Sequence, residues 1–220
     1  TPSHPKGSLI SQNLSFDDLF SFDVASKEAR SNFETLFQTY EKEIGDQTES
    51  LLRKLDAGSN EIKGELINLF AAKLLNSFRN PHCIDKTLNT IGMVGEYIPL
   101  DPDLAKISAL IEQGRRPHQK KLCEDLGITN ERYTKWLRVL FMLLMRPAGG
   151  SNMLDEIIKS LYEDPSHHLG IFVFTYTDEH ADKHPLLSDR SFSSPSIDDG
   201  ALVFSCNLSS NAFISYAFVH

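Results

Sequence analysis

The feature that most constrains the fold is a change of hydrophobic period about three quarters of the way along this 220-residue chain. Up to about residue 163, apolar side chains recur every three or four residues, which is the spacing of one buried helix face. From Gly170 onward, the segments 170–176, 201–206 and 212–219 are instead rich in β-branched and aromatic residues, as strands are. This order predicts an α+β fold, mostly helical over about 30–165, with a small antiparallel sheet formed mainly by the C-terminal third, about 168–220.

Capping and breaking residues divide the helical part. Ser59 or Asn60 is predicted to cap a second helix, which Asn80-Pro81 ends. The pair Asp101-Pro102 is typical of an N-cap followed by a first-turn proline. The helices predicted in this way cover about 32–55, 60–80, 84–91, 101–111 and 152–163, in addition to a central pair.

The N-terminal region is predicted to differ from the rest. Residues 1–13 are polar and without periodicity, so a flexible lead-in is expected there. Phe20, Phe22 and Val24 then alternate with polar residues and predict a short strand that joins the sheet. Residues 14–220 are expected to form a single domain.

Composition is typical of an ordinary globular protein, with 40% hydrophobic and 24% charged residues. A net charge of -8 argues against affinity of the whole surface for nucleic acid or an anionic membrane. The longest apolar run, 139–145, has seven residues, far fewer than the ~20 that span a bilayer. The cysteines, Cys83, Cys123 and Cys206, form no metal-binding pair, so reduced thiols in a cytoplasmic protein without cofactor are predicted.

The charge is unevenly distributed. Residues 115–146 contain eight basic and three acidic side chains, which makes that window +5 and leaves -13 for the remainder. A basic central surface is therefore predicted on an acidic protein, and such a surface is a candidate contact region for a partner.

Within this window, residues 120–138 are typical of a helix-turn-helix, with Gly127 in the turn between two helices. The second helix would carry Tyr133 and Trp136 on one side and Lys135 and Arg138 on the other. Basic and amide side chains of such a helix contact phosphates and base edges in DNA-binding proteins. The residues predicted for this role are Lys120, Lys121, Asn130, Arg132, Thr134, Lys135 and Arg138.

The same segment is also typical of an ordinary protein core. Helices joined by a glycine turn are common in helical proteins, and residues 139–145 are apolar on every side, as in a buried helix. Glu131 would also be repelled by phosphates at a DNA groove. The sequence therefore leaves both a DNA-reading helix and a central core helix open.

Two further candidates lie elsewhere. His180, Asp182 and His184 have side chains that bind divalent metals or transfer protons, although their spacing in a polar loop fixes no geometry. With Asp189 they predict a metal-dependent hydrolase or nuclease-like effector, and a solvated loop is the alternative. Arg79, at a predicted helix end, would either complement the helix dipole or bind an anion in a cleft.

Several segments together resemble a bacterial domain family of unknown function. Its members often begin with a His-Phe-Ile-Pro-type stretch and carry a Ser-Asp-x-Pro block before the final strands. The opening stretch is missing here, and Arg190-Ser-Phe stands where the family tends to have asparagine and proline. The resemblance implies a helical body with strands and a bacterial, intracellular setting, and it brings no established activity. The matching segments are 18–24, 32–55, 66–81, 185–190 with its Ser188-Asp189 pair, and 202–208.

These observations rank a non-enzymatic binding or interaction protein first, with residues 115–146 as its contact surface and a protein or nucleic acid as its partner. DNA binding through the helix pair and metal-dependent catalysis through His180, Asp182 and His184 are the alternatives. Membrane association is not expected, and whether the chain is an enzyme and how it oligomerises are left open by the sequence.

Overall fold

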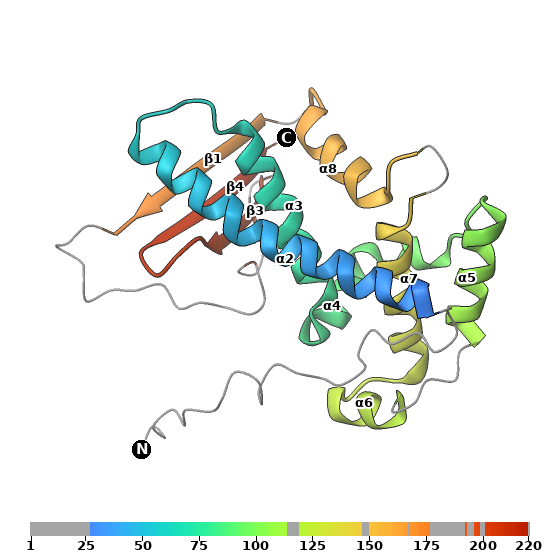
Figure 1. Cartoon of the computed structure of the whole chain (residues 1–220). Helices are drawn as coiled ribbons and strands as arrows, with labels where there is room; N and C mark the ends of the chain where they lie inside the picture. Colours follow the sequence, from blue (N-terminus) through green and yellow to red (C-terminus); the bar gives the residue numbers. More distant parts are fainter. Residues whose placement is uncertain are drawn as a thin grey trace, which may run out of the picture.

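The computed structural model of the chain describes residues 27–113, 119–146, 150–166, 168–176, 192, 196–198 and 201–219. Figure 1 shows a mostly helical body with a sheet from the C-terminal third. The sheet is antiparallel and has four strands among the described residues, and this architecture confirms the predicted fold class. The lead-in at 1–13 and the strand expected at Phe20 to Val24 lie outside the described residues.

The predicted helices and C-terminal strands in the described ranges are present. The helices are α2 (Lys27–Asp56), α3 (Lys63–Arg79), α4 (Ile84–Ile91), α5 (Pro102–Gln113), α6 (Gln119–Leu126), α7 (Asn130–Leu144) and α8 (Met153–Glu163). Two short 3-10 helices, η1 (Pro81–Cys83) and η2 (Gly92–Glu96), flank α4. The strands are β1 (His168–Thr175), β2 (Ser196–Asp198), β3 (Ala201–Asn207) and β4 (Ala212–Val219).

A side chain caps α5 as predicted, and another caps α8. An Asp101 carboxylate oxygen accepts hydrogen bonds from the backbone N–H groups of Asp103 and Leu104, at 2.9 and 3.1 Å. The Asn152 side chain accepts one from the N–H of Asp155 at 2.7 Å. Each bond satisfies a donor that the first turn of a helix leaves unpaired, so these residues fix where the two helices begin.

The predicted start of α3 is wrong by a few residues. Neither Ser59 nor Asn60 caps it, because α3 begins at Lys63 after Ile62, which makes no side-chain capping bond. Gly58, with a φ of +68°, ends α2 instead, and its N–H and that of Ser59 bond back to carbonyls in the last turn of α2. Ser59 therefore belongs to the C-terminal cap of the preceding helix.

The sheet has the strand order β1-β4-β3-β2, and alternate residues of its strands face the helices. The buried face includes Ile214, Tyr216 and Phe218 of β4. On the opposite face of β1, Phe172 and Phe174 are 53% and 47% exposed, and Phe174 stacks on Phe213 at 4.6 Å between ring centroids. The sheet thus joins the helical body through one face and leaves aromatic rings on the other.

Phe70 of α3 lies where the helices meet the sheet. Its ring is fully buried, with centroid distances of 4.9 to 5.8 Å to the neighbouring aromatic rings. The Tyr216 hydroxyl donates a hydrogen bond to the Leu66 carbonyl of the same helix at 3.1 Å. One hydrophobic cluster therefore includes α3, α7, α8 and the sheet. The rings around Phe70 are those of Tyr162, Phe192, Phe204, Tyr216 and Phe218.

Two tyrosines of this cluster have buried hydroxyl groups, and they predict substitution effects of opposite sign. The Tyr162 hydroxyl has no hydrogen-bond partner among the described residues, whereas that of Tyr216 has one. Burial raises the pKa of both phenols, so both stay neutral in the fold. Tyr162→Phe is expected to raise the free energy of unfolding by about 1 kcal/mol, because it removes an unsatisfied buried group. Tyr216→Phe is expected to lower it by about 1 kcal/mol or more.

Urea denaturation followed by far-ultraviolet circular dichroism measures both tyrosine effects, with each variant serving as the control for the other. Destabilisation by Tyr162→Phe of the same size as by Tyr216→Phe would show that the Tyr162 hydroxyl has a partner in the folded protein.

Candidate functional site

The predicted central helix pair is present as α6 and α7. Gly127 has a φ of +67°, and its N–H and that of Ile128 bond back to carbonyls of the last turn of α6. The Thr129 side chain accepts a hydrogen bond from the N–H of Arg132 and so caps α7. The turn chemistry predicted from the glycine is thus correct.

Helix α7 is nevertheless a core helix for most of its length. Eight of its 15 residues are buried, and it contacts α4, η2, α5, α6 and α8. A Cβ atom placed on Gly95 of η2 would lie 3.0 Å from a Val139 methyl carbon and 3.1 Å from the Lys135 carbonyl oxygen. The backbone of η2 therefore packs directly on α7, along the side that a DNA groove would have to reach.

Three of the predicted DNA-contacting cations on α7 form ion pairs with acidic side chains from three surrounding elements. Arg132 contacts Asp85 of α4 at 2.6 Å. Lys135 contacts Glu96 of η2 at 2.6 Å and holds the pKa of that carboxyl below its ordinary value. Arg138, whose side chain is only 16% exposed, contacts Glu112 of α5 at 3.3 Å. These pairs are local charge compensation across the helix bundle.

The other residues predicted for DNA contact do not form one free face with them. The Asn130 side-chain oxygen lies 3.3 Å from both the Gln119 amide nitrogen and the Cys123 sulfur, so it ties the start of α7 to α6. Lys120 lies 3.9 Å from Glu124, and Lys121 is exposed on α6. Thr134 is half-buried.

The predicted metal site cannot be placed. His180, Asp182, His184 and Asp189 lie outside the described residues. Among the described ones, no group of three or more histidine, cysteine, aspartate and glutamate side chains is arranged to hold a metal ion. Arg79 ends α3, where its Nε donates to the Asn76 side chain at 2.9 Å and its guanidinium lies 5.3 Å from the centroid of the Phe37 ring.

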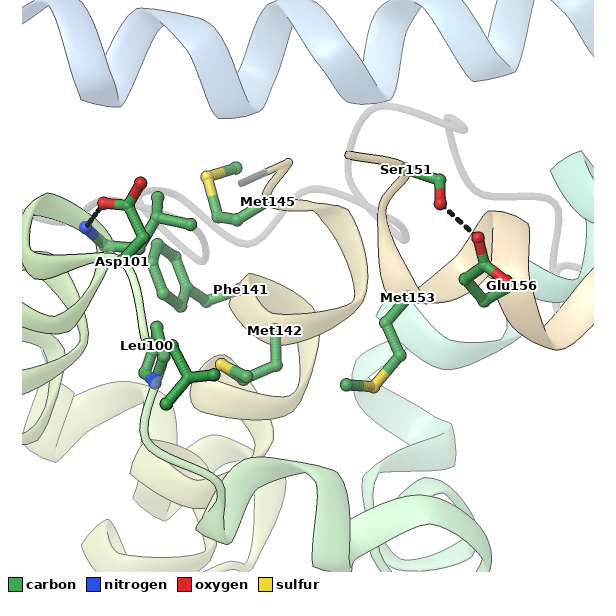
Figure 2. Close-up of a pocket in the computed structure, with 10 residues that line it drawn as sticks. Leu100, Asp101, Phe141, Met142, Met145, Ser151, Met153 and Glu156 are labelled. Atoms are coloured by element: carbon green, nitrogen blue, oxygen red, sulfur yellow. Dashed lines mark hydrogen bonds between the residues drawn. The ribbon is translucent and has the colours of Figure 1, made fainter. Parts of the chain in front are cut away.

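A site that the sequence did not predict lies at the other end of α7. Here α7, α8 and the start of α5 enclose a half-open pocket of about 440 Å³ (Figure 2). We call it the methionine pocket, because three of the four methionines of the chain line it. Its lining is otherwise mostly aliphatic and aromatic. The lining residues are Pro99, Leu100, Asp101, Leu104, Phe141, Met142, Met145, Ser151, Met153 and Glu156.

The local sequence explains why these side chains meet. Met142 and Met145 lie three residues apart, which places them on the same side at the end of α7. Helix α7 ends at Leu144 and α8 begins at Met153, whose side chain lies beside that of Met142 in Figure 2. All three methionine side chains are half-buried, so their flexible thioethers line a surface that adapts to different apolar shapes.

An exposed apolar segment leads into the pocket from the side of η2. Tyr97 and Ile98 are 58% and 76% exposed, and Leu100 at the mouth is fully exposed. Single exposed apolar residues are ordinary, but three within four positions, the last of which lines the pocket, add exposed apolar surface close to it in the chain.

Two carboxylates lie at opposite sides of the pocket in Figure 2. Asp101 caps α5, and Glu156 in the first turn of α8 accepts a hydrogen bond from the Ser151 hydroxyl. Neither forms an ion pair with another described residue, whereas their neighbours Asp103 and Asp155 pair with Lys106 and Arg146. The mouth of the pocket is therefore apolar between two carboxylates that no cation among the described residues pairs with.

Comparison with known proteins identifies no relative: no family model, curated protein or solved structure matches this chain. The resemblance to a bacterial family of unknown function therefore stays a prediction. Within the described ranges, no helix is both long and apolar enough to cross a membrane.

Proposed function

We propose that this protein is a non-enzymatic interaction module, and that it holds an apolar segment of a partner protein in the methionine pocket. The observation that carries the proposal is the pocket itself, whose volume of about 440 Å³ lies in the range of ordinary ligand sites. Thioether side chains suit it to peptide side chains of several shapes. The exposed residues Tyr97, Ile98 and Leu100 would add contact area beside it.

The proposal keeps the class of function that the sequence favours and moves the contact from the basic side chains to the C-terminal end of α7. Arg132, Lys135 and Arg138 are engaged by acidic side chains of the same protein, so releasing them for a partner would leave those acids unpaired. DNA binding through α7 and metal chemistry at 180–184 remain alternatives. The three cysteines are buried and form no disulfide with one another, which supports a cytoplasmic location.

Methionine methyl resonances offer a direct test. In protein labelled with [13C-methyl]methionine, Met142, Met145 and Met153 report on the pocket, and Met93, which does not line it, serves as an internal control. The probe is a short capped peptide with two leucines and a phenylalanine between glutamines. We expect saturable shifts of the three pocket methyl signals and little change at Met93, because apolar side chains enter between the thioethers.

The matched variants are Leu100→Ser at the pocket mouth and Phe172→Ser on the outer face of the sheet. Each replaces a large exposed apolar side chain with serine. Leu100→Ser removes a leucine that becomes buried on binding, so it is expected to lower the affinity for the peptide about tenfold or more. Phe172→Ser is expected to leave the affinity unchanged. Absence of shifts at the pocket methyl groups up to peptide solubility would overturn the proposal.

A further inference from the structure

From the two carboxylates at its mouth, we infer that the methionine pocket selects a basic partner segment, in which apolar anchor residues are flanked on both sides by lysine or arginine. This inference rests on the proposed function, because it names the chemistry of the segment held in the same pocket. The apolar floor cannot distinguish one apolar peptide from another by charge, so selectivity for charge has to come from the rim.

The first step of the argument is the placement of the charges. Figure 2 shows Asp101 and Glu156 on opposite sides, with Met142 and Met153 between them. A segment that places apolar residues on the methionines therefore has to pass both carboxylates. One flanking cation on each side of the apolar anchor matches this arrangement.

The second step is that these charges remain available. One Asp101 oxygen accepts two backbone N–H bonds, and Glu156 accepts the Ser151 hydroxyl, but hydrogen bonds of this kind leave the charge in place. Each carboxylate sits at a helix N-terminus, whose partial charge of about +0.5 offsets only part of a full negative charge. The nearby cations Lys106 and Arg146 are paired with Asp103 and Asp155.

The third step is the field of the whole molecule. With a net charge of -8, the chain attracts cations over a distance and repels anionic peptides and anionic lipid surfaces. Around an apolar pocket, this negative field raises the association rate of a basic segment and makes its binding free energy more favourable. An acidic segment with the same apolar residues would meet two like charges at the rim.

The test compares three capped peptides with identical apolar residues and lysine, glutamine or glutamate as flanking residues. Affinities are taken from the methyl shifts of Met142, Met145 and Met153. Exposed ion pairs are individually weak, so two of them are expected to make the lysine peptide about three- to tenfold tighter than the glutamine peptide at low salt. The glutamate peptide is expected to bind more weakly than the glutamine peptide by a similar factor. The differences in affinity among the three peptides should shrink in 1 M salt.

Substitution of the carboxylates assigns the effect. In Asp101→Asn/Glu156→Gln, asparagine still caps α5 and glutamine still accepts the Ser151 hydrogen bond, so the fold is preserved. The lysine and glutamine peptides should then bind with about equal affinity. The control Asp125→Asn/Glu131→Gln removes two exposed charges away from the pocket and should retain the preference.

The outcomes separate the two claims. Three results would overturn the inference and leave the proposed function standing. These are equal affinity for all three peptides, a preference for the glutamate peptide, and a preference for the lysine peptide that survives in the double variant. Failure of all three peptides to shift the pocket methyl groups overturns both.

Discussion

Replacing Phe70 with alanine is expected to lower the free energy of unfolding by about 3–5 kcal/mol. The Phe70 ring is fully buried and contacts aromatic rings of the sheet and, through Tyr162, of α8. Aromatic neighbours are too large and too constrained to collapse into the space that the ring leaves, so the loss includes a cavity as well as the transfer free energy of the ring.

Urea denaturation measures this effect with two probes. The chain has one tryptophan, Trp136 on α7, whose fluorescence reports on the helical body, while circular dichroism reports on the whole chain. Because one hydrophobic cluster includes α7 and the sheet, we expect both signals to change at the same urea concentration, before and after the substitution. Separate transitions would show that the helical body and the sheet unfold independently, against the predicted single domain.

Phe172→Ala is the matched control for this prediction. Phe172 is the same residue type on the outer face of β1, where it is 53% exposed. Its loss is expected to cost less than about 1 kcal/mol, since most of its surface already faces water. A Phe70→Ala effect as small as that of Phe172→Ala would contradict the central position of the Phe70 ring.

The fold class could be predicted because it depends on local chemistry. Asp101-Pro102, Asn152 and Gly127 each act within four residues of their own position, through caps or a positive φ, and the structure places helix ends at all three. The Ser59 prediction failed for a related reason. Ser59 is a good N-cap residue, but Gly58 ends the preceding helix, and the backbone N–H of Ser59 bonds into the C-terminal cap of that helix. The C-cap signal of Gly58 and the N-cap signal of Ser59 are one residue apart and therefore compete.

The role of the basic window could not be predicted from its own residues. Arg132, Lys135 and Arg138 have the spacing of a groove-facing surface, yet their partners Asp85, Glu96 and Glu112 lie 26 to 47 positions earlier in the chain. A local pattern of cations contains no information about which acids the tertiary fold brings to them.

The methionine pocket escaped prediction because it is formed by three separate elements. Met142 and Met145 alone are typical of a core helix, and Leu100 alone is an ordinary surface residue. Their meeting depends on how the tertiary fold places the end of α7, the start of α8 and the segment before α5 beside one another. A cluster of three of the four methionines within residues 142–153 is the signal that could have suggested an adaptable surface.

Trp136→Ala is expected to lower the free energy of unfolding by about 3–5 kcal/mol, and the size of this loss decides what kind of helix α7 is. The Trp136 side chain is fully buried, and its indole N–H donates a 2.7 Å hydrogen bond to the Phe78 carbonyl near the end of α3. A helix that reads DNA from the surface of a small domain would tolerate changes along much of its length. A helix enclosed by α4, η2, α5 and α8 would not.

Two variants separate the ring from its hydrogen bond. Trp136→Phe keeps much of the apolar volume but leaves the buried Phe78 carbonyl without the indole donor, and we expect it to cost about 1–3 kcal/mol, less than the alanine variant. Lys135→Ala, one residue earlier, breaks an ion pair between exposed groups and is expected to cost less than about 1 kcal/mol. Chemical denaturation followed by circular dichroism compares all three. If Trp136→Ala cost no more than Lys135→Ala, α7 would be a peripheral helix, and both its ion pairs and the pocket at its end would have to be reassigned.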